Sequence, residues 1–320
     1  MGFAIPVTKL IKLNFFMKKF TALLSLTIFL SACAPASTPS DEGLTITASF
    51  YPLGEMARKV AGDHAEVITI TPAGSDPHEY EPSPKDIAAI NESDLFIFNG
   101  AGQDPWAEKL ELENTTIIHM TENFSLLEGG DHDDEENHDE DEEEHEFDPH
   151  IWLDPTQAAK EAEIIAEKLM EVDPQNAAIY QANAEEYKQE LMQLDAEYQQ
   201  TLSACQKDSI ITAHAAFGYM ASRYGFNQIA IAGLSPEQEP SARKLAEIAD
   251  LAEEEDIKYI FFETLTSPRI SETLAQEVGA QTLLLDPVEG LTQEQMAAGE
   301  NYVTVMRRNL KNLAIALECQ

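Results

Sequence analysis

Short, apolar, β-branched segments recur along this chain in two groups of four, and between the groups runs a long stretch without glycine. The first group lies before residue 121 and the second after residue 208: 44–49, 67–71, 95–99 and 116–120, then 209–213, 229–232, 259–263 and 282–286. Nearly continuous apolar strands separated by amphipathic segments are typical of parallel sheets that are buried on both faces. The pattern therefore predicts an α/β protein with two lobes, each containing a four-stranded, mainly parallel sheet flanked by helices.

The stretch 175–204 between the two groups contains no glycine or proline, and it predicts one long α-helix. Its apolar residues follow a four-three spacing, so one face is apolar over about 45 Å at 1.5 Å per residue. The positions are Tyr180, Ala184, Tyr187, Leu191, Leu194, Tyr198 and Thr201. We expect this helix to join an N-terminal lobe, 43–174, to a C-terminal lobe, 205–320. A coiled coil is the alternative, but α/β patterns on both sides favour packing within the chain.

Four helix starts are marked by a capping side chain followed by proline, which is favoured at the first helical position. These pairs are Ser83-Pro84, Asp154-Pro155, Asp173-Pro174 and Ser267-Pro268. They agree with the predicted alternation of strands and helices.

The N-terminus carries the features of an export signal. Two lysines precede an apolar run over 20–30, which is too short for a membrane span and leads into the sequence LSAC at 30–33. This end resembles a bacterial lipobox, which implies cleavage before Cys33 and a lipid on its thiol; an ordinary signal peptide is the alternative. The signal occupies 1–33, with Met17 as a possible true start, and 34–42 reads as a flexible tether. We therefore expect an extracytoplasmic protein anchored to a bacterial membrane.

Beyond Cys33 the chain contains two cysteines, Cys205 and Cys319. An exported protein folds in an oxidising compartment, where two remaining thiols can pair. We expect a disulfide between them.

The formal net charge of −38 argues against a nucleic-acid partner, because phosphate binding needs a basic surface. Much of this charge lies in one segment, 129–146, where His132, His138 and His145 alternate with carboxylates. Such a density of like charge predicts a mobile loop. The three histidines could bind cations weakly, or the loop could simply be solvated.

Four residues are candidate metal ligands: His78 in the loop after a predicted strand, His150 shortly before a capped helix, and His214 and Asp286 at the ends of predicted strands. Three of them have a simpler explanation when taken alone: His78 as a solvated loop histidine, His214 as a satisfied core histidine and Asp286 as a helix or loop cap. Ligands of open α/β sheets bind beyond the carboxyl ends of the strands, and here each lobe supplies two candidates. Three imidazoles and one carboxylate suit tetrahedral Zn²⁺, whereas manganese prefers more oxygen ligands.

Five sequence blocks resemble the zinc and manganese solute-binding lipoproteins of ABC transporters, in the cluster with a rigid linking helix. The blocks are SFYPL at 49–53, DPHEYEPSP at 76–84, HIWLDP at 150–155, TAHAAFGY at 212–219 and FFE at 261–263. They stand in the family's order and span nearly all of the mature chain. The resemblance implies a periplasmic-binding-protein-like fold.

This resemblance implies that His78, His150, His214 and Asp286 are the metal ligands. It favours the zinc branch, because the position of His214 tends to be glutamate in the manganese binders. It also implies a monomer that delivers its ion to a permease and ATPase complex, with manganese as the alternative cargo. Glu263 could accept a hydrogen bond from a ligand or serve as an alternative oxygen ligand.

Two other classes of function remain open from the sequence. A metal-dependent hydrolase needs an open coordination position, which four protein ligands would close, and the chain has no HExxH motif. We therefore expect a binding protein and not an enzyme. A surface adhesin is the second alternative, and the sequence alone does not oppose it.

Overall fold

The computed structural model describes residues 43–129, 147–238 and 240–320, and these residues form one compact unit. Cys33, His132, His138 and His145 lie outside the described residues, so the predicted lipid anchor and loop ligands remain predictions. Among the described helices, none is both long and apolar enough to cross a bilayer.

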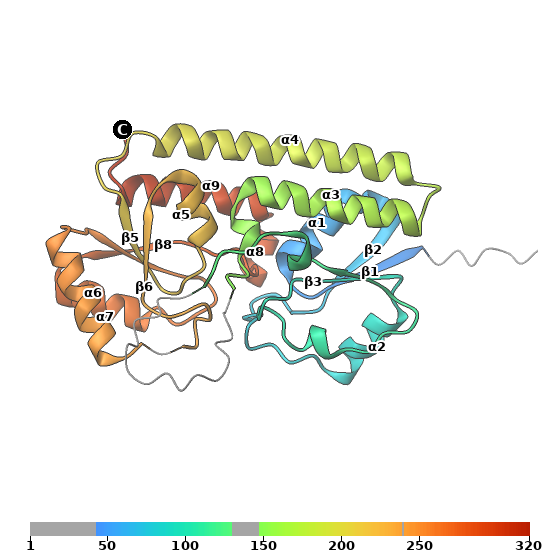
Figure 1. Ribbon diagram of the computed structural model, residues 1–320, viewed down its shortest axis with the longest axis horizontal. Helices are drawn as coiled ribbons and strands as arrows, with labels where there is room; N and C mark the ends of the chain where they lie inside the picture. The colour runs from blue at the N-terminus through green and yellow to red at the C-terminus, as the bar shows by residue number, and fades with distance from the viewer. Residues whose placement is uncertain (1–42, 130–146, 239) are drawn as a thin grey trace, which may run out of the picture. The chain divides into compact units, whose positions relative to one another are not determined.

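The N-terminal lobe contains a four-stranded parallel sheet in the order β2-β1-β3-β4 (Figure 1). Its strands are β1 (Leu44–Ala48), β2 (Ala65–Thr69), β3 (Leu95–Phe98) and β4 (Thr116–His119). Helix α1 (Tyr51–Ala61) packs on one face with Leu95 and Ile97, while α2 (Pro84–Glu92) packs on the other with Phe96 and Phe98. Alternate residues of β3 thus face opposite helical layers, which explains its uninterrupted apolar sequence.

The C-terminal lobe repeats this plan with the parallel order β6-β5-β7-β8. Its strands are β5 (Ser209–Thr212), β6 (Asn227–Ala230), β7 (Tyr259–Phe262) and β8 (Gln281–Leu284). Its helices are α5 (Gly218–Tyr224), α6 (Ala242–Glu254), α7 (Arg269–Val278), α8 (Gln293–Ala297) and α9 (Tyr302–Ala316). The predicted fold class is confirmed, although β2 and β6 each begin two residues earlier than their apolar segments.

A layer of long helices connects the lobes. Helix α4 (Ala177–Leu202) runs beside α3 (Pro155–Val172). Helix α9 lies beneath the C-terminal half of α4 (Figure 1). Six of the seven predicted stripe residues are buried on α4 and belong to a hydrophobic cluster that includes Ile46 of β1 and Leu313 of α9, whereas Thr201 is half-buried and Leu202 is buried beside it. The stripe therefore packs within the chain, as favoured over a coiled coil.

Two of the four predicted helix starts are correct. The side chains of Ser83 and Asp154 accept hydrogen bonds from the first turns of α2 and α3. The other two helices begin later: α4 is preceded by Asn176 and α7 by Pro268. Asp173 instead follows α3, and its carboxylate accepts hydrogen bonds from Asn176 and from the hydroxyl of Tyr180, each at 2.7 Å.

A disulfide joins Cys205 to Cys319, the pairing expected from the sequence. It ties the segment between α4 and β5 to the C-terminus. The backbone N–H groups of Gln206 and Lys207 strengthen this junction by donating to the carbonyl of Leu317, both at 3.1 Å.

One buried acid stands apart from any site. Glu161 of α3 is fully buried, and among the described residues neither of its carboxylate oxygens has a hydrogen-bond partner. Burial raises the pKa of Glu161 well above its ordinary value of 4.5. The unfolded chain therefore releases this proton at a lower pH than the folded protein does, and stability falls as the pH rises above that ordinary value.

Replacing Glu161 by glutamine should stabilise the metal-free protein at pH 8 by about 1–3 kcal/mol and change it little at pH 5. The amide has a similar size but does not ionise in the unfolded chain. Urea unfolding at both pH values measures the effect, with Glu167→Gln on the exposed face of α3 as the matched control. An equal gain at both pH values would contradict the pKa argument.

Candidate functional site

Four side chains from both lobes meet in one cluster: His78, His150, His214 and Glu289. One ligand atom from each lies within 4.8 Å of those of the other three. His78 lies in the loop after β2, and His150 directly precedes a short 3-10 helix, Ile151–Leu153. His214 follows the end of β5 and Glu289 follows the end of β8, so both lie at the carboxyl edge of their sheet.

The cluster is arranged around one carboxylate oxygen. Glu289 Oε1 lies 3.1 Å from His78 Nε2, 3.3 Å from His150 Nε2 and 3.6 Å from His214 Nε2. The Nε2 atoms of His150 and His214 are 3.4 Å apart. The side chains are nearly closed off from solvent, with that of His78 the most exposed at 5%.

Two carboxylates hold the outer sides of two imidazoles in the same way. Asp148 Oδ1 accepts hydrogen bonds from His150, from the backbone N–H at 2.9 Å and from Nδ1 at 2.8 Å. Glu263 Oε1 does the same for His214, at 3.2 Å and 2.8 Å. A proton on Nδ1 leaves Nε2 free to bind a metal, so these contacts fix both ring orientation and tautomer.

The charges of the cluster balance one another. Burial by itself would raise the pKa of Glu289, but the surrounding imidazoles, His78 foremost, hold it well below its ordinary value. Burial would lower the pKa of His214, but the charges of Glu263 and Glu289 hold it well above 6.5. The pKa of His150 is also raised, because its bonds to Asp148 and Glu289 outweigh burial. A cation that binds here would therefore displace protons from His150 and His214.

Asp286, the expected fourth ligand, lies outside this cluster. Its Oδ1 accepts a hydrogen bond from the backbone N–H of Val288 at 2.9 Å, and its Oδ2 accepts one from the hydroxyl of Thr264 at 2.6 Å. Glu289 lies where Asp286 was expected, because the chain turns after β8 and carries the next acid to the histidines. Glu289 was not predicted as a ligand from the sequence, although Pro287 and Gly290 on either side mark such a turn.

The donor set fits a tetrahedral metal ion. Ligand atoms about 2.05 Å from a central zinc lie about 3.3 Å from one another at the corners of a tetrahedron. Four of the six distances among the ligand atoms, 3.1 to 3.6 Å, lie around this value, and all six lie within 4.8 Å. Imidazole nitrogens favour zinc, nickel and copper over manganese.

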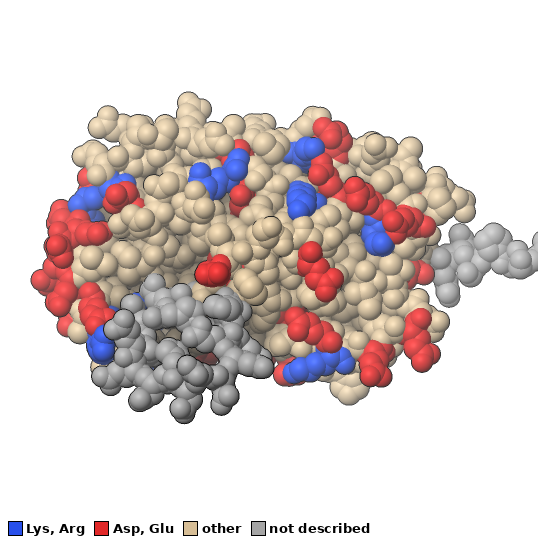
Figure 2. Space-filling view, in the orientation of Figure 1, with Lys and Arg blue, Asp and Glu red and all other residues tan. Residues whose placement is uncertain are grey.

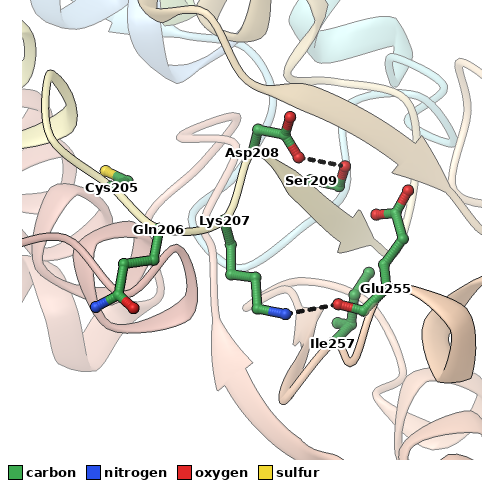
Figure 3. A pocket seen from close by; sticks show the side chains of 7 residues that line it. All are labelled: Cys205, Gln206, Lys207, Asp208, Ser209, Glu255 and Ile257. Atoms are coloured by element: carbon green, nitrogen blue, oxygen red, sulfur yellow. Dashed lines mark hydrogen bonds between the residues drawn. The ribbon is translucent and has the colours of Figure 1, made fainter.

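A second hollow in the C-terminal lobe is a separate feature (Figure 3). It is lined by Cys205, Gln206, Lys207, Asp208, Ser209, Glu255 and Ile257. Lys207 Nζ donates to the carbonyl of Glu255 at 2.6 Å. This hollow lies where β5 begins, whereas His214 follows the end of that strand, and no histidine lines it.

Comparison with known proteins gives consistent matches. The model of the ZnuA family, described as zinc-uptake complex component A, periplasmic, matches residues 46–316. The zinc-binding lipoprotein AdcA of Streptococcus pneumoniae is 40% identical over 304 residues, which cover 93% of this chain. The chain spans about 60% of the length of AdcA.

Two solved structures resemble the fold closely. The Zn(II)-bound ZnuA-like domain of S. pneumoniae AdcA is 39% identical, with a TM-score of 0.74, and the match covers 86% of this chain and 99% of that domain. The laminin-binding protein of Streptococcus agalactiae, described as bifunctional with adhesin and metal-transporting activity, is 33% identical. Its TM-score is 0.77, and the match covers 86% of this chain and 100% of that one.

Proposed function

The chain belongs to the ZnuA family of periplasmic zinc-uptake components, and from this premise we propose that it captures Zn²⁺ outside the cytoplasm and delivers it to an ABC importer. The observation that carries the proposal is the buried group of three imidazoles and one carboxylate, whose ligand atoms lie within 4.8 Å of one another. His78, His150, His214 and Glu289 would bind the ion as cargo. Asp148 and Glu263 would hold two of the imidazoles in the orientation and tautomer that bind the ion.

Zinc is favoured over manganese by the donor atoms. Manganese sites in proteins are typically built from oxygen ligands, whereas three of the four donors here are nitrogens. The abundance of surface carboxylates fits a cationic cargo, as Figure 2 shows for one face, where acidic side chains (red) outnumber basic ones (blue). Those carboxylates would attract cations in general, so selectivity has to come from the buried site.

A competition titration tests the proposal. The full chain, stripped of metal, is titrated with zinc and with manganese by calorimetry, and zinc is then added to the manganese-loaded protein. We expect one tight zinc site per chain and displacement of manganese by zinc. A preference for manganese would move the cargo to the alternative metal, and the lack of any tight site would refute the four-ligand assignment.

We also propose the further assignments that were made from the sequence. They are the signal over 1–33, lipidation of Cys33, the tether over 34–42, and the lobes 43–174 and 205–320 joined by a linking helix over 175–204. The permease and ATPase of an ABC transporter are the proposed partners. A hydrolase is disfavoured because the matched family is a component of zinc uptake, while the adhesin alternative stays a prediction.

A further inference from the structure

We propose that Asp286 is a positioning residue, whose carboxylate holds the backbone turn that presents Glu289 to the metal. The inference rests on the proposed zinc-binding function and adds a residue that does not touch the ion. It explains why a buried carboxylate stands three residues before the ligand.

The turn has an unusual backbone at Val288. This residue is fully buried and has a φ of +58°. Left-handed conformations are rare for β-branched residues, because the branched side chain crowds the backbone. The chain therefore needs contacts that hold Val288 in this conformation, directly before the residue that faces the histidines.

Side chains hold the backbone of three consecutive residues in this turn. Asn309 of α9 accepts from the N–H of Asp286 at 3.0 Å and donates to its carbonyl at 2.6 Å. Trp152 donates its indole N–H to the carbonyl of Pro287 at 2.8 Å. Asp286 itself accepts from the N–H of Val288 at 2.9 Å, so its side chain is the contact that acts on the left-handed residue.

The carboxylate of Asp286 is held in place by its other oxygen. Oδ2 accepts from the hydroxyl of Thr264 at 2.6 Å and lies 3.4 Å from Arg308 Nη2. These contacts orient Oδ1 toward the N–H of Val288. Asp286 thus connects the body of the C-terminal lobe to the turn that carries Glu289.

The turn also contacts the N-terminal lobe on both sides of Glu289. Before it, Trp152 binds Pro287; after it, the N–H of Gly74 donates to the carbonyl of Leu291 at 3.0 Å. A displaced Val288 would therefore move Glu289 relative to the histidines of both lobes. We expect a change in metal geometry as well as in affinity.

Two substitutions of Asp286 separate the acceptor from the charge. Asp286→Ala removes the acceptor for Val288 and should weaken zinc binding about 10–100-fold, as measured by chelator competition on the full chain. Asp286→Asn keeps an oxygen for that N–H and should bind much more tightly than the alanine variant. The d–d absorption spectrum of the Co²⁺-loaded protein should change in Asp286→Ala and be restored in Asp286→Asn. Asp250→Ala, on the exposed surface of α6, is the control.

A second change tests the backbone argument. Glycine adopts a φ of +58° without strain, so adding Val288→Gly to Asp286→Ala should recover part of the lost affinity. If Asp286→Ala does not fold, Asp286→Ser tests the same contact. Its hydroxyl is a weaker acceptor than the carboxylate, so this variant should bind zinc more weakly than the wild type.

The outcomes distinguish this inference from the proposed function. If the wild type itself lacks a tight zinc site, the proposed function fails before any variant is compared. If the wild type binds zinc and Asp286→Ala matches it in affinity and Co²⁺ spectrum, the positioning role is wrong. The role is also wrong if Asp286→Asn is as weak as Asp286→Ala and glycine at 288 gives no recovery, since Asp286 would then act through its charge.

Discussion

His214→Ala should weaken zinc binding by about two to three orders of magnitude. Structural zinc sites contribute about 10–16 kcal/mol, so one of four ligands accounts for about 3–4 kcal/mol. His214 is fully buried, and its removal also leaves the carboxylate of Glu263 without the imidazole it holds. Competition with a zinc chelator of known affinity measures the loss.

His64→Ala is the matched control for this substitution. His64 is an exposed histidine in the 3-10 helix Gly62–His64, and it lies outside the cluster. We expect zinc affinity to be unchanged in this variant. A loss of less than tenfold in His214→Ala would show that His214 is not a metal ligand.

Zinc at about 1,000 times its dissociation constant should raise the melting temperature of the protein by about 10 °C. Binding to the folded state alone contributes about 4 kcal/mol at this concentration, and each kcal/mol shifts the melting temperature of a chain this size by a few degrees. The ligands come from both lobes, so the gain should apply to the whole body. Calorimetric melting with and without zinc measures the shift, and a chelator should reverse it.

Glu289→Gln gives this second prediction its control. The amide retains the size of the side chain but lacks the negative charge that faces three imidazoles. Zinc should shift the melting temperature of this variant much less than that of the wild type. An equal shift in both proteins would place the stabilising zinc elsewhere.

The strands were predictable because parallel sheets covered on both faces require continuous apolar sequence. The segment 95–99, for example, sends Leu95 and Ile97 to one helical layer and Phe96 and Phe98 to the other. The three histidine ligands were predictable from their local sequence, because His78 lies in the loop after β2, His150 precedes a capped helix and His214 follows the end of β5. The stripe of α4 followed from its four-three spacing.

The fourth ligand was not predictable by the same reasoning. Asp286 and Glu289 are both acids after β8, and the choice between them depends on the left-handed turn at Val288. Two of the interactions that hold this turn come from Trp152 and Asn309, which are distant in sequence. The start of α4 was missed for a similar reason, since the carboxylate of Asp173 binds the hydroxyl of Tyr180 instead of capping the helix.

The hydrophobic cluster shared by the two lobes limits how such proteins can be recombined. Ile46 of the first lobe, Leu191 of α4 and Leu313 of the second lobe belong to one core. Either half alone would expose its side of this core to water. A chimera that takes one lobe from a relative would have to match the partner's side of this core. The two halves should consequently be inherited and engineered as a single module, despite the similarity of their sheets.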